Sequence, residues 1–223
     1  MLERLRGLIV SIQPASDSVL NSPETVALLA RCAVANGAAG VRIEGGKRIA
    51  AVRRAVDVPI VGLRKRAHPG FEPYITATRE DLDEVAVAGA DVVAFDATLR
   101  ARPGGWSVAD AVAAIHARGL TAMADCATEV ELRAAAAAGA DIVATTLCGY
   151  TADTRGTPLP AFALLPAAVA SGAFAILEGG VAAPADVRRA FDAGAGAVVV
   201  GTAISDIDAQ VRRFAQAAAR ERA

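Results

Sequence analysis

Lys65 is the residue whose type points most directly to chemistry. Lysine and arginine together number 23, and only Lys47 and Lys65 are lysines. A guanidinium does not deprotonate in practice, whereas an amine can act as a base or a nucleophile once its pKa falls. We expect the neighbouring Arg64 and Arg66 to lower the pKa of Lys65 by like-charge repulsion. This composition favours a chemical role for Lys65 over a solvated basic turn.

Glu178 and several other polar side chains end short apolar segments. Glu178 follows Phe174-Ala175-Ile176-Leu177, and its carboxylate could serve as an acid or as half of a structural ion pair. The other polar ends are Gln13, Arg42, Asp96 and Asp125. Buried polar groups are costly unless they are paired, so we expect either a mutual hydrogen-bond network or a substrate-binding ring. For Asp96 both roles are equally open.

Two glycine-containing turns could bind an anion. They read Glu178-Gly179-Gly180-Val181 and Gly201-Thr202-Ala203-Ile204, and each leads towards a helix. Glycine has no Cβ, so backbone N–H groups can turn towards a phosphate, and a helix start adds partial positive charge. Plain strand-to-helix turns are the alternative interpretation.

A repeated sequence pattern marks the helices and strands that must position these groups. Gly37, Gly89, Gly139 and Gly194 each end an alanine-rich helical segment and precede a β-branched run. They lie 52, 50 and 55 residues apart, about twice the roughly 25 to 30 residues of one βα unit. Further apolar runs fall in the gaps between them, which gives eight units.

Eight strands and eight helices are predicted. The strands are Leu8–Gln13, Gly40–Ile43, Pro59–Leu63, Val92–Phe95, Leu120–Asp125, Ile142–Thr145, Ala173–Glu178 and Ala197–Val200. The helices are Pro23–Asn36, Lys47–Val56, Glu80–Ala88, Val108–Arg118, Glu129–Ala138, Leu159–Ser171, Pro184–Ala193 and Ile207–Ala219. Strict alternation with near-continuous apolar strands predicts a parallel sheet covered by helices.

We therefore predict a single α/β domain over residues 1–223, folded as an eight-stranded TIM barrel. A doubly wound open sheet is the alternative, but the repeat is even and no GxGxxG motif follows the first strand. In a barrel the functional groups lie just past the carboxyl ends of the strands, and the last two βα loops commonly hold phosphate. Both glycine turns occupy those loops, which favours the anion site.

Composition excludes several other classes of function. A net charge of −1 with scattered arginines gives no field for nucleic acid. No apolar stretch approaches 18 residues, and the start lacks a secretory signal, so we expect no membrane segment and a cytoplasmic protein. Three cysteines without CxxC spacing indicate neither a disulfide framework nor a zinc site, and no other metal site is predicted.

In their order, the motifs resemble the bacterial N-acetylmannosamine-6-phosphate 2-epimerase family over nearly the full length. The segments that carry the resemblance are Gly7–Gln13, Val41–Gly45, Gly62–Arg66, Tyr74–Thr78, Asp96–Thr98 with Arg102-Pro103, Met123–Cys126, Thr145–Thr151, Glu178-Gly179 and Val199–Ile204. One such motif alone would be a weak signal, whereas their shared order is specific.

The resemblance implies a barrel of the ribulose-phosphate-binding type that epimerises C2 of an N-acetylated hexosamine 6-phosphate in sialic acid degradation. It implies no cofactor, and a homodimer is a family-level expectation. Lys65 would take a proton from one face of C2, and Glu178 would return one to the other face. Gln13, Arg42 and Asp125 would position the open sugar. Its phosphate would be held by Gly179, Gly180, Gly201 and Thr202.

One departure from the family concerns the phosphate end. The family commonly follows Ala-Ile-Thr with arginine, whereas this chain reads Ala203-Ile204-Ser205-Asp206. Either this chain binds phosphate more weakly, or Arg155 or another cation takes the place of that arginine. Two rival functions also stay open: a Schiff-base lyase with Lys65 as the nucleophile, and a sugar phosphate-binding protein without catalysis.

Overall fold

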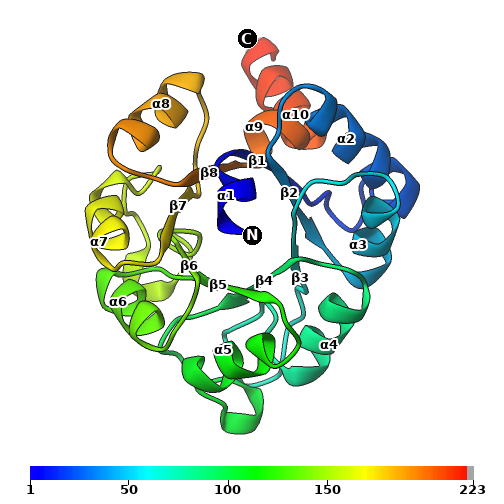
Figure 1. Cartoon of the computed structure of the whole chain (residues 1–223). Coiled ribbons are helices and arrows are strands. Elements are labelled where there is room, and N and C mark those ends of the chain that lie inside the picture. The colour runs from blue at the N-terminus through cyan, green and yellow to red at the C-terminus, as the bar shows by residue number, and fades with distance from the viewer. Residues whose placement is uncertain (220–223) are drawn as a thin grey trace.

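Eight parallel strands close into a barrel in the computed structural model, which describes residues 1–219 (Figure 1). The strands are β1 (Gly7–Ile12), β2 (Gly40–Glu44), β3 (Ile60–Leu63), β4 (Val92–Asp96), β5 (Thr121–Asp125), β6 (Ile142–Ala144), β7 (Phe174–Glu178) and β8 (Ala197–Val200). They follow one another in chain order, and β8 pairs with β1 to close the ring. The predicted TIM barrel is confirmed.

Helices surround the barrel, except for the short first helix, which lies across its amino-terminal end (Figure 1). They are α1 (Leu2–Leu5), α2 (Pro23–Ala35), α3 (Gly46–Arg53), α4 (Arg79–Val87), α5 (Val108–His116), α6 (Glu129–Ala137), α7 (Leu165–Ala170), α8 (Pro184–Asp192), α9 (Thr202–Ser205) and α10 (Ile207–Ala218). Three short 3-10 turns, η1 (Pro103–Gly105), η2 (Ala152–Thr154) and η3 (Phe162–Leu164), lie in the loops. Among these described elements, no helix is long and apolar enough to cross a membrane.

Local sequence explains where several of the helices begin and end. Each of four N-cap side chains accepts a hydrogen bond from the backbone N–H three residues later, and these caps are Ser22, Thr78, Ser107 and Thr128. The four repeated glycines, Gly37, Gly89, Gly139 and Gly194, all have φ between +90° and +97°, which only glycine adopts at little cost. The repeat therefore marks helix ends, as predicted.

One predicted helix begins later than expected. The sequence predicts a helix over Leu159–Ser171, but α7 begins at Leu165 and η3 precedes it. Pro166 is the second residue of α7. Proline has no N–H to donate and is tolerated only in the first helical turn, so the helix starts immediately before it.

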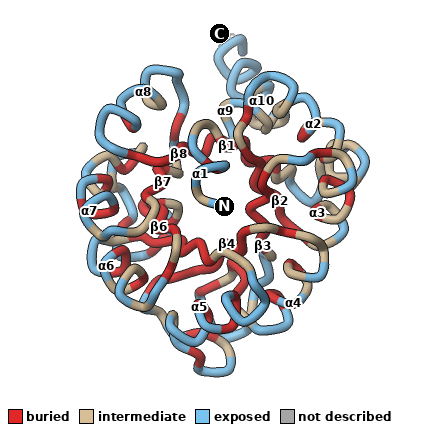
Figure 2. Tube along the Cα trace, viewed as in Figure 1, coloured by how far each residue is buried: buried red, intermediate tan, exposed pale blue. Residues whose placement is uncertain are grey.

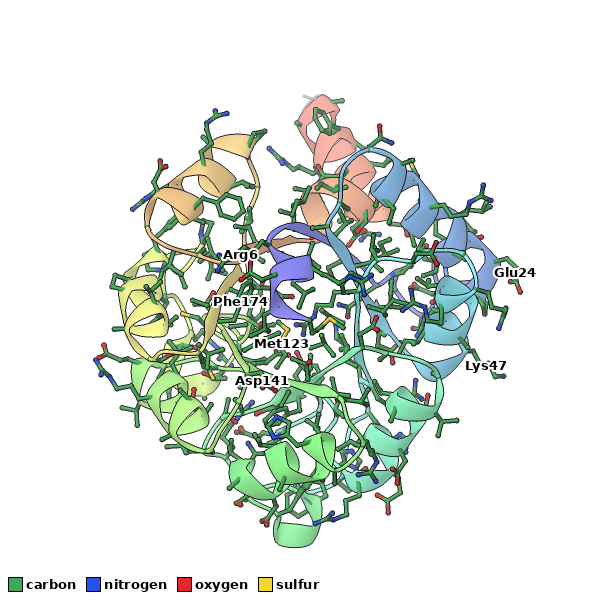
Figure 3. The ribbon with its side chains drawn as sticks, in the orientation of Figure 1. Arg6, Glu24, Lys47, Met123, Asp141 and Phe174 are labelled. Carbon is green, nitrogen blue, oxygen red and sulfur yellow. The ribbon has the colours of Figure 1, made fainter. Side chains whose placement is uncertain are left out.

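Apolar side chains form two cores, one between the strands and the helices and the other inside the barrel. Figure 2 shows that buried residues run along the strands of the barrel. The inner core includes Leu5 of α1, which is fully buried and helps to close the amino-terminal end of the barrel. Figure 3 shows Met123 near the barrel axis and Arg6 beside Phe174, with the guanidinium 5.5 Å from the ring centroid. The opposite end of the barrel is therefore the open one.

Candidate active site

A cavity of about 600 Å³ opens at the carboxyl ends of the strands. Eight of the nine predicted site residues line it: Gln13, Arg42, Lys65, Glu178, Gly179, Gly180, Gly201 and Thr202. They come from the ends of β1, β2, β3, β7 and β8. Asp125 is the exception, because it is fully buried and does not line the cavity.

Arg42, Asp125 and Glu178 form an ion-paired group under the cavity, called here the floor triad. Arg42 is 1% exposed, and its Nη2 lies 2.6 Å from Asp125 Oδ2 while its Nη1 lies 2.9 Å from Glu178 Oε2. Burial alone would lower the pKa of Arg42, but the two carboxylates outweigh burial and raise it. The guanidinium therefore stays charged at the base of the cavity.

Glu178 is held in a state that can bind a proton near neutral pH. Its pKa is raised to about 7, chiefly by burial and also by repulsion from Asp125, while Arg42 acts in the opposite direction. The side chain is 12% exposed. Its hydrogen bonds from Arg42 and Thr146 both fall on Oε2, which leaves Oε1 available to carry a proton.

Thr146 bridges the two carboxylates of the floor triad. Its Oγ1 lies 2.7 Å from Asp125 Oδ1 and 3.1 Å from Glu178 Oε2. A threonine hydroxyl has one proton, so it can donate to only one of these oxygens at a time. No role is predictable for Thr146 from the sequence, because this contact joins β5, β7 and the loop after β6, which are distant in the chain.

Lys65 lies in the loop between β3 and α4. Its side chain is exposed to the open cavity, yet burial by the surrounding protein still lowers its pKa, and repulsion from Arg42 and Arg48 acts in the same direction. Glu178 and Asp125 oppose that change. A lower pKa increases the fraction of Lys65 that is neutral and able to accept a proton.

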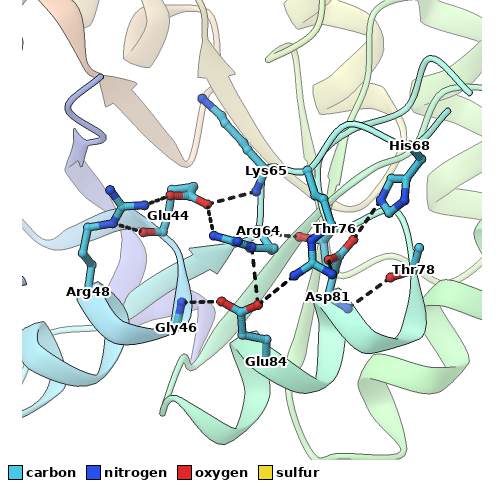
Figure 4. Close-up of polar contacts among 11 residues, drawn as sticks. Glu44, Gly46, Arg48, Arg64, Lys65, His68, Thr76, Thr78, Asp81 and Glu84 are labelled. Carbon is cyan, nitrogen blue, oxygen red and sulfur yellow. Dashed lines mark hydrogen bonds and ion pairs between the residues drawn. The ribbon is translucent and has the colours of Figure 1, made fainter. Parts of the chain in front are cut away.

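The backbone of Lys65, in contrast to its ammonium group, is firmly bonded. Its N–H donates to Glu44 Oε1 at 3.2 Å. The loop then doubles back, so that Lys65 pairs with Ile75 in an antiparallel bridge, and the Thr76 N–H donates to the Arg64 carbonyl at 2.7 Å. In Figure 4 the Lys65 side chain points away from the ion pairs that hold its loop.

These ion pairs form a second charged group, called here the rim network. Its members are Glu44, Arg48, Arg64, Arg66, His68, Asp81 and Glu84. Arg64 lies 3.0 Å from Glu44 (Figure 4), and Arg66 lies 3.2 Å from Glu84. The expectation that Arg64 and Arg66 depress the pKa of Lys65 is wrong, because the cations that repel the Lys65 ammonium are Arg42 and Arg48.

The glycine turns form another wall of the cavity. Gly179 and Gly180 have φ of +101° and +71°, and a Cβ added at Gly180 would lie 2.5 Å from Leu159 Cβ. The turn itself therefore requires glycine, whatever it binds. Gln13 lies near this wall and donates to Ser11 Oγ at 2.8 Å, while its Oε1 is buried without a partner among the described residues.

Asp96 belongs to a structural network outside the cavity. Its carboxylate accepts hydrogen bonds from Thr98 at 2.6 Å and Arg100 at 2.8 Å, and its backbone carbonyl accepts two from Arg102. It is 1% exposed and does not line the cavity. Tyr74, by contrast, lines the cavity without having been predicted to do so. Within residues 1–219 no cluster of metal-ligating side chains is found.

Comparison with known proteins gives a consistent set of relatives. The family model described as "Putative N-acetylmannosamine-6-phosphate epimerase" matches residues 26–220. A protein from Thermosynechococcus vestitus, named "Putative N-acetylmannosamine-6-phosphate 2-epimerase", is 46% identical over 95% of this chain and 92% of its own length. A Yersinia pestis protein of the same name is 45% identical over 91% and 85% of the two chains.

Solved structures agree with the sequence matches. The N-acetylmannosamine-6-phosphate 2-epimerase from Clostridium perfringens superposes with a TM-score of 0.93 at 37% identity, covering 97% of this chain and 96% of the other. A 3-hexulose-6-phosphate synthase superposes with a TM-score of 0.62 at 22% identity over 88% and 90% of the chains, which reflects the shared fold alone. The chain belongs to the N-acetylmannosamine-6-phosphate 2-epimerase family.

Proposed function

We propose that this protein interconverts N-acetylmannosamine 6-phosphate and N-acetylglucosamine 6-phosphate by inverting C2. The observation that carries the proposal is the meeting of Lys65 and Glu178 in one cavity, with the pKa of the lysine lowered and that of the carboxyl raised. These opposite shifts favour a neutral amine beside a protonated acid. That pair suits transfer of one proton off a carbon and another onto it.

The chemistry begins once the sugar ring opens to its aldehyde form. The C2 hydrogen is then α to the carbonyl, and Lys65 Nζ removes it from one face to leave an enolate. Glu178 delivers its proton to C2 from the opposite face, so the configuration inverts. Exchange with solvent afterwards removes the proton from Lys65 and restores the one on Glu178.

The floor triad has two tasks in this proposal. The Arg42 guanidinium supplies positive charge beside the cavity, where the negative charge of an enolate would develop. Asp125 does not line the cavity, so its role is to orient Arg42 and to raise the pKa of Glu178 rather than to contact the sugar. Gln13, with its unpartnered Oε1, accepts a hydrogen bond from the substrate. Gly179, Gly180, Gly201 and Thr202 hold the phosphate.

Solvent isotope incorporation tests the activity. The protein is incubated with N-acetylmannosamine 6-phosphate in D2O, and C2 is followed by NMR. We expect the gluco product to form with deuterium at C2, because the returned proton comes from solvent-equilibrated Glu178. Absence of product at high enzyme concentration would reject the activity. A substrate-dependent, borohydride-reducible adduct on Lys65 would contradict its role as a base.

Cellular context and partners follow from charge and surface. We propose a cytoplasmic enzyme, since a charged sugar phosphate does not cross a membrane unaided, and no nucleic acid partner, since the net charge is −1.

We also propose a homodimer. Ile207, Val211 and Phe214 form an apolar stripe on α10 that is 49%, 60% and 70% exposed, and a second copy would cover it. Light scattering should report a dimer that Phe214→Asp weakens.

A further inference from the structure

The charges around the cavity are unevenly distributed between its two ends. Within residues 1–219, the cations that line it are Arg42, Lys65 and Arg213. Arg42 is paired with Asp125 and Glu178, and Lys65 must be neutral to act as a base. Both belong to the end where C2 would react. Arg213 is therefore the cation that stays available for the phosphate of the proposed substrate.

Helical spacing places Arg213 on the correct face of α10. The residues of this region that line the cavity are Asp206, Ala209, Gln210 and Arg213, at offsets of zero, three, four and seven. Such offsets share one face of a helix. Helical side chains also lean towards the amino-terminal end of their helix. The Arg213 side chain thus leans towards Gly201 and Thr202, at the start of α9.

A direct contact ties this face of α10 to the glycine turn. Gln210 Nε2 donates to the Thr202 carbonyl at 2.8 Å. Arg213 lies one turn further along the same face. Its guanidinium lies 5.9 Å from the ring centroid of Phe214, a contact that a doubly charged phosphate can displace.

Asp206 does not occupy the site as a free anion. Its carboxylate caps α10 by accepting a hydrogen bond from the Ala209 N–H at 2.9 Å, so its charge is directed at the helix start. The other candidate cation, Arg155, is exposed and does not line the cavity. The substitution of an anion at position 206 therefore leaves Arg213 as the compensating charge.

We infer that Arg213 binds the phosphate group of the substrate and sets the preference of this chain for phosphorylated over unphosphorylated sugar. The inference rests on the proposed function for the identity of that substrate. Gln210 acts beside it as a positioning residue that fixes α10 against the Gly201-Thr202 turn.

Phosphate binding and steady-state kinetics test the inference together. The variants are Arg213→Ala and Arg213→Lys, with Arg212→Ala as the matched control because Arg212 is exposed and does not line the cavity. Calorimetry with inorganic phosphate should show binding about 10- to 100-fold weaker in Arg213→Ala, the range for loss of a charged hydrogen bond. Arg213→Lys should recover part of the loss, and Arg212→Ala should match the wild type.

Kinetics should show the same pattern. For N-acetylmannosamine 6-phosphate, KM should rise about 10- to 100-fold in Arg213→Ala, while kcat changes by less than about threefold. Any turnover of unphosphorylated N-acetylmannosamine should be unaffected. Wild-type phosphate affinity and KM in Arg213→Ala would overturn the inference, even if epimerisation is observed. Conversely, the protein could bind phosphate through Arg213 and yet show no epimerase activity. That result would reject the proposed function but not the role of Arg213 in binding phosphate.

Discussion

The two proposed catalytic side chains are held in different ways. Glu178 is fixed through its carboxylate, by Arg42 of the floor triad and by Thr146, whereas Lys65 is fixed through its backbone and loop, by the rim network. Both regions pair arginines with carboxylates, but the floor is buried and the rim is partly exposed. Burial at the floor favours the protonated form of Glu178, whereas the rim network fixes the position of the Lys65 backbone.

This difference explains how acid and base can coexist in one cavity. An acid must keep its proton near neutral pH, which requires desolvation of its charged form. In the proposed cycle Lys65 must then lose a proton to solvent and Glu178 must regain one, and both side chains line the same open cavity. Burial favours the protonated form of Glu178, while the exposed Lys65 can pass its proton to solvent.

The largest expected effect comes from Lys65→Arg. This change keeps the positive charge but removes the amine that can deprotonate, so kcat for epimerisation should fall by about 10³-fold or more. Lys47→Arg is the matched control, since Lys47 is exposed on α3 and points outward from the barrel (Figure 3). A coupled assay for the gluco product measures both. If Lys65→Arg retained a tenth of wild-type activity, the Lys65 amine could not be the base that removes the C2 proton.

Removal of Arg42 from the floor should lower the free energy of unfolding more than removal of an arginine from the rim. Arg42→Met leaves two carboxylates without their cation, and we expect the free energy of unfolding to fall by about 3–5 kcal/mol. Arg66→Met, at the partly exposed rim, should cost no more than about 1 kcal/mol. Urea denaturation monitored by circular dichroism compares them. Equal losses would contradict the distinction between the two regions.

Glu178 should make stability depend on pH with a defined sign. Because its folded pKa is raised from the ordinary 4.5 to about 7, the folded state binds a proton that the unfolded state has released between these values. The wild type should therefore lose stability relative to Glu178→Gln as pH rises from about 4.5 to 7, on the order of 3 kcal/mol in total. Urea midpoints at several pH values give the difference. A constant difference would show that Glu178 has an ordinary pKa.

The smallest expected effect belongs to Thr146→Val. The Thr146 hydroxyl lowers the pKa of Glu178, so its removal should move the limb of the kcat/KM profile near pH 7 upward by as much as about one unit. The other limb should stay in place, and Thr146→Ser should restore the original profile. A uniform loss of rate without movement of that limb would give Thr146 a structural role only.

Much of the fold was predictable because its signals are local. The apolar runs and the glycines after each second helix located all eight strands. Two short helices, α1 and α9, escaped prediction since four residues carry little periodicity. The start of α7 was missed because Pro166 was not read as a residue of the first helical turn.

The sequence predicts which residues line the cavity, but not which of their side chains pair with one another. Strand ends identified Gln13, Arg42, Lys65 and Glu178, which line one cavity. No local pattern shows that Arg42 pairs with Asp125. Nor does one show that carboxylates of β2 and α4 pair with Arg64 and Arg66. Such contacts join segments up to 136 residues apart, and only the closed barrel brings them together.

The central claim is that Lys65 and Glu178 act on opposite faces of C2, and exchange without inversion tests it most directly. In D2O, Glu178→Gln should exchange the C2 proton of N-acetylmannosamine 6-phosphate without forming the gluco sugar, because Lys65 still acts on its own face. Lys65→Met should exchange only N-acetylglucosamine 6-phosphate, through Glu178. If each variant exchanges both sugars at similar rates, or neither exchanges any, the two residues do not divide the faces of C2 between them.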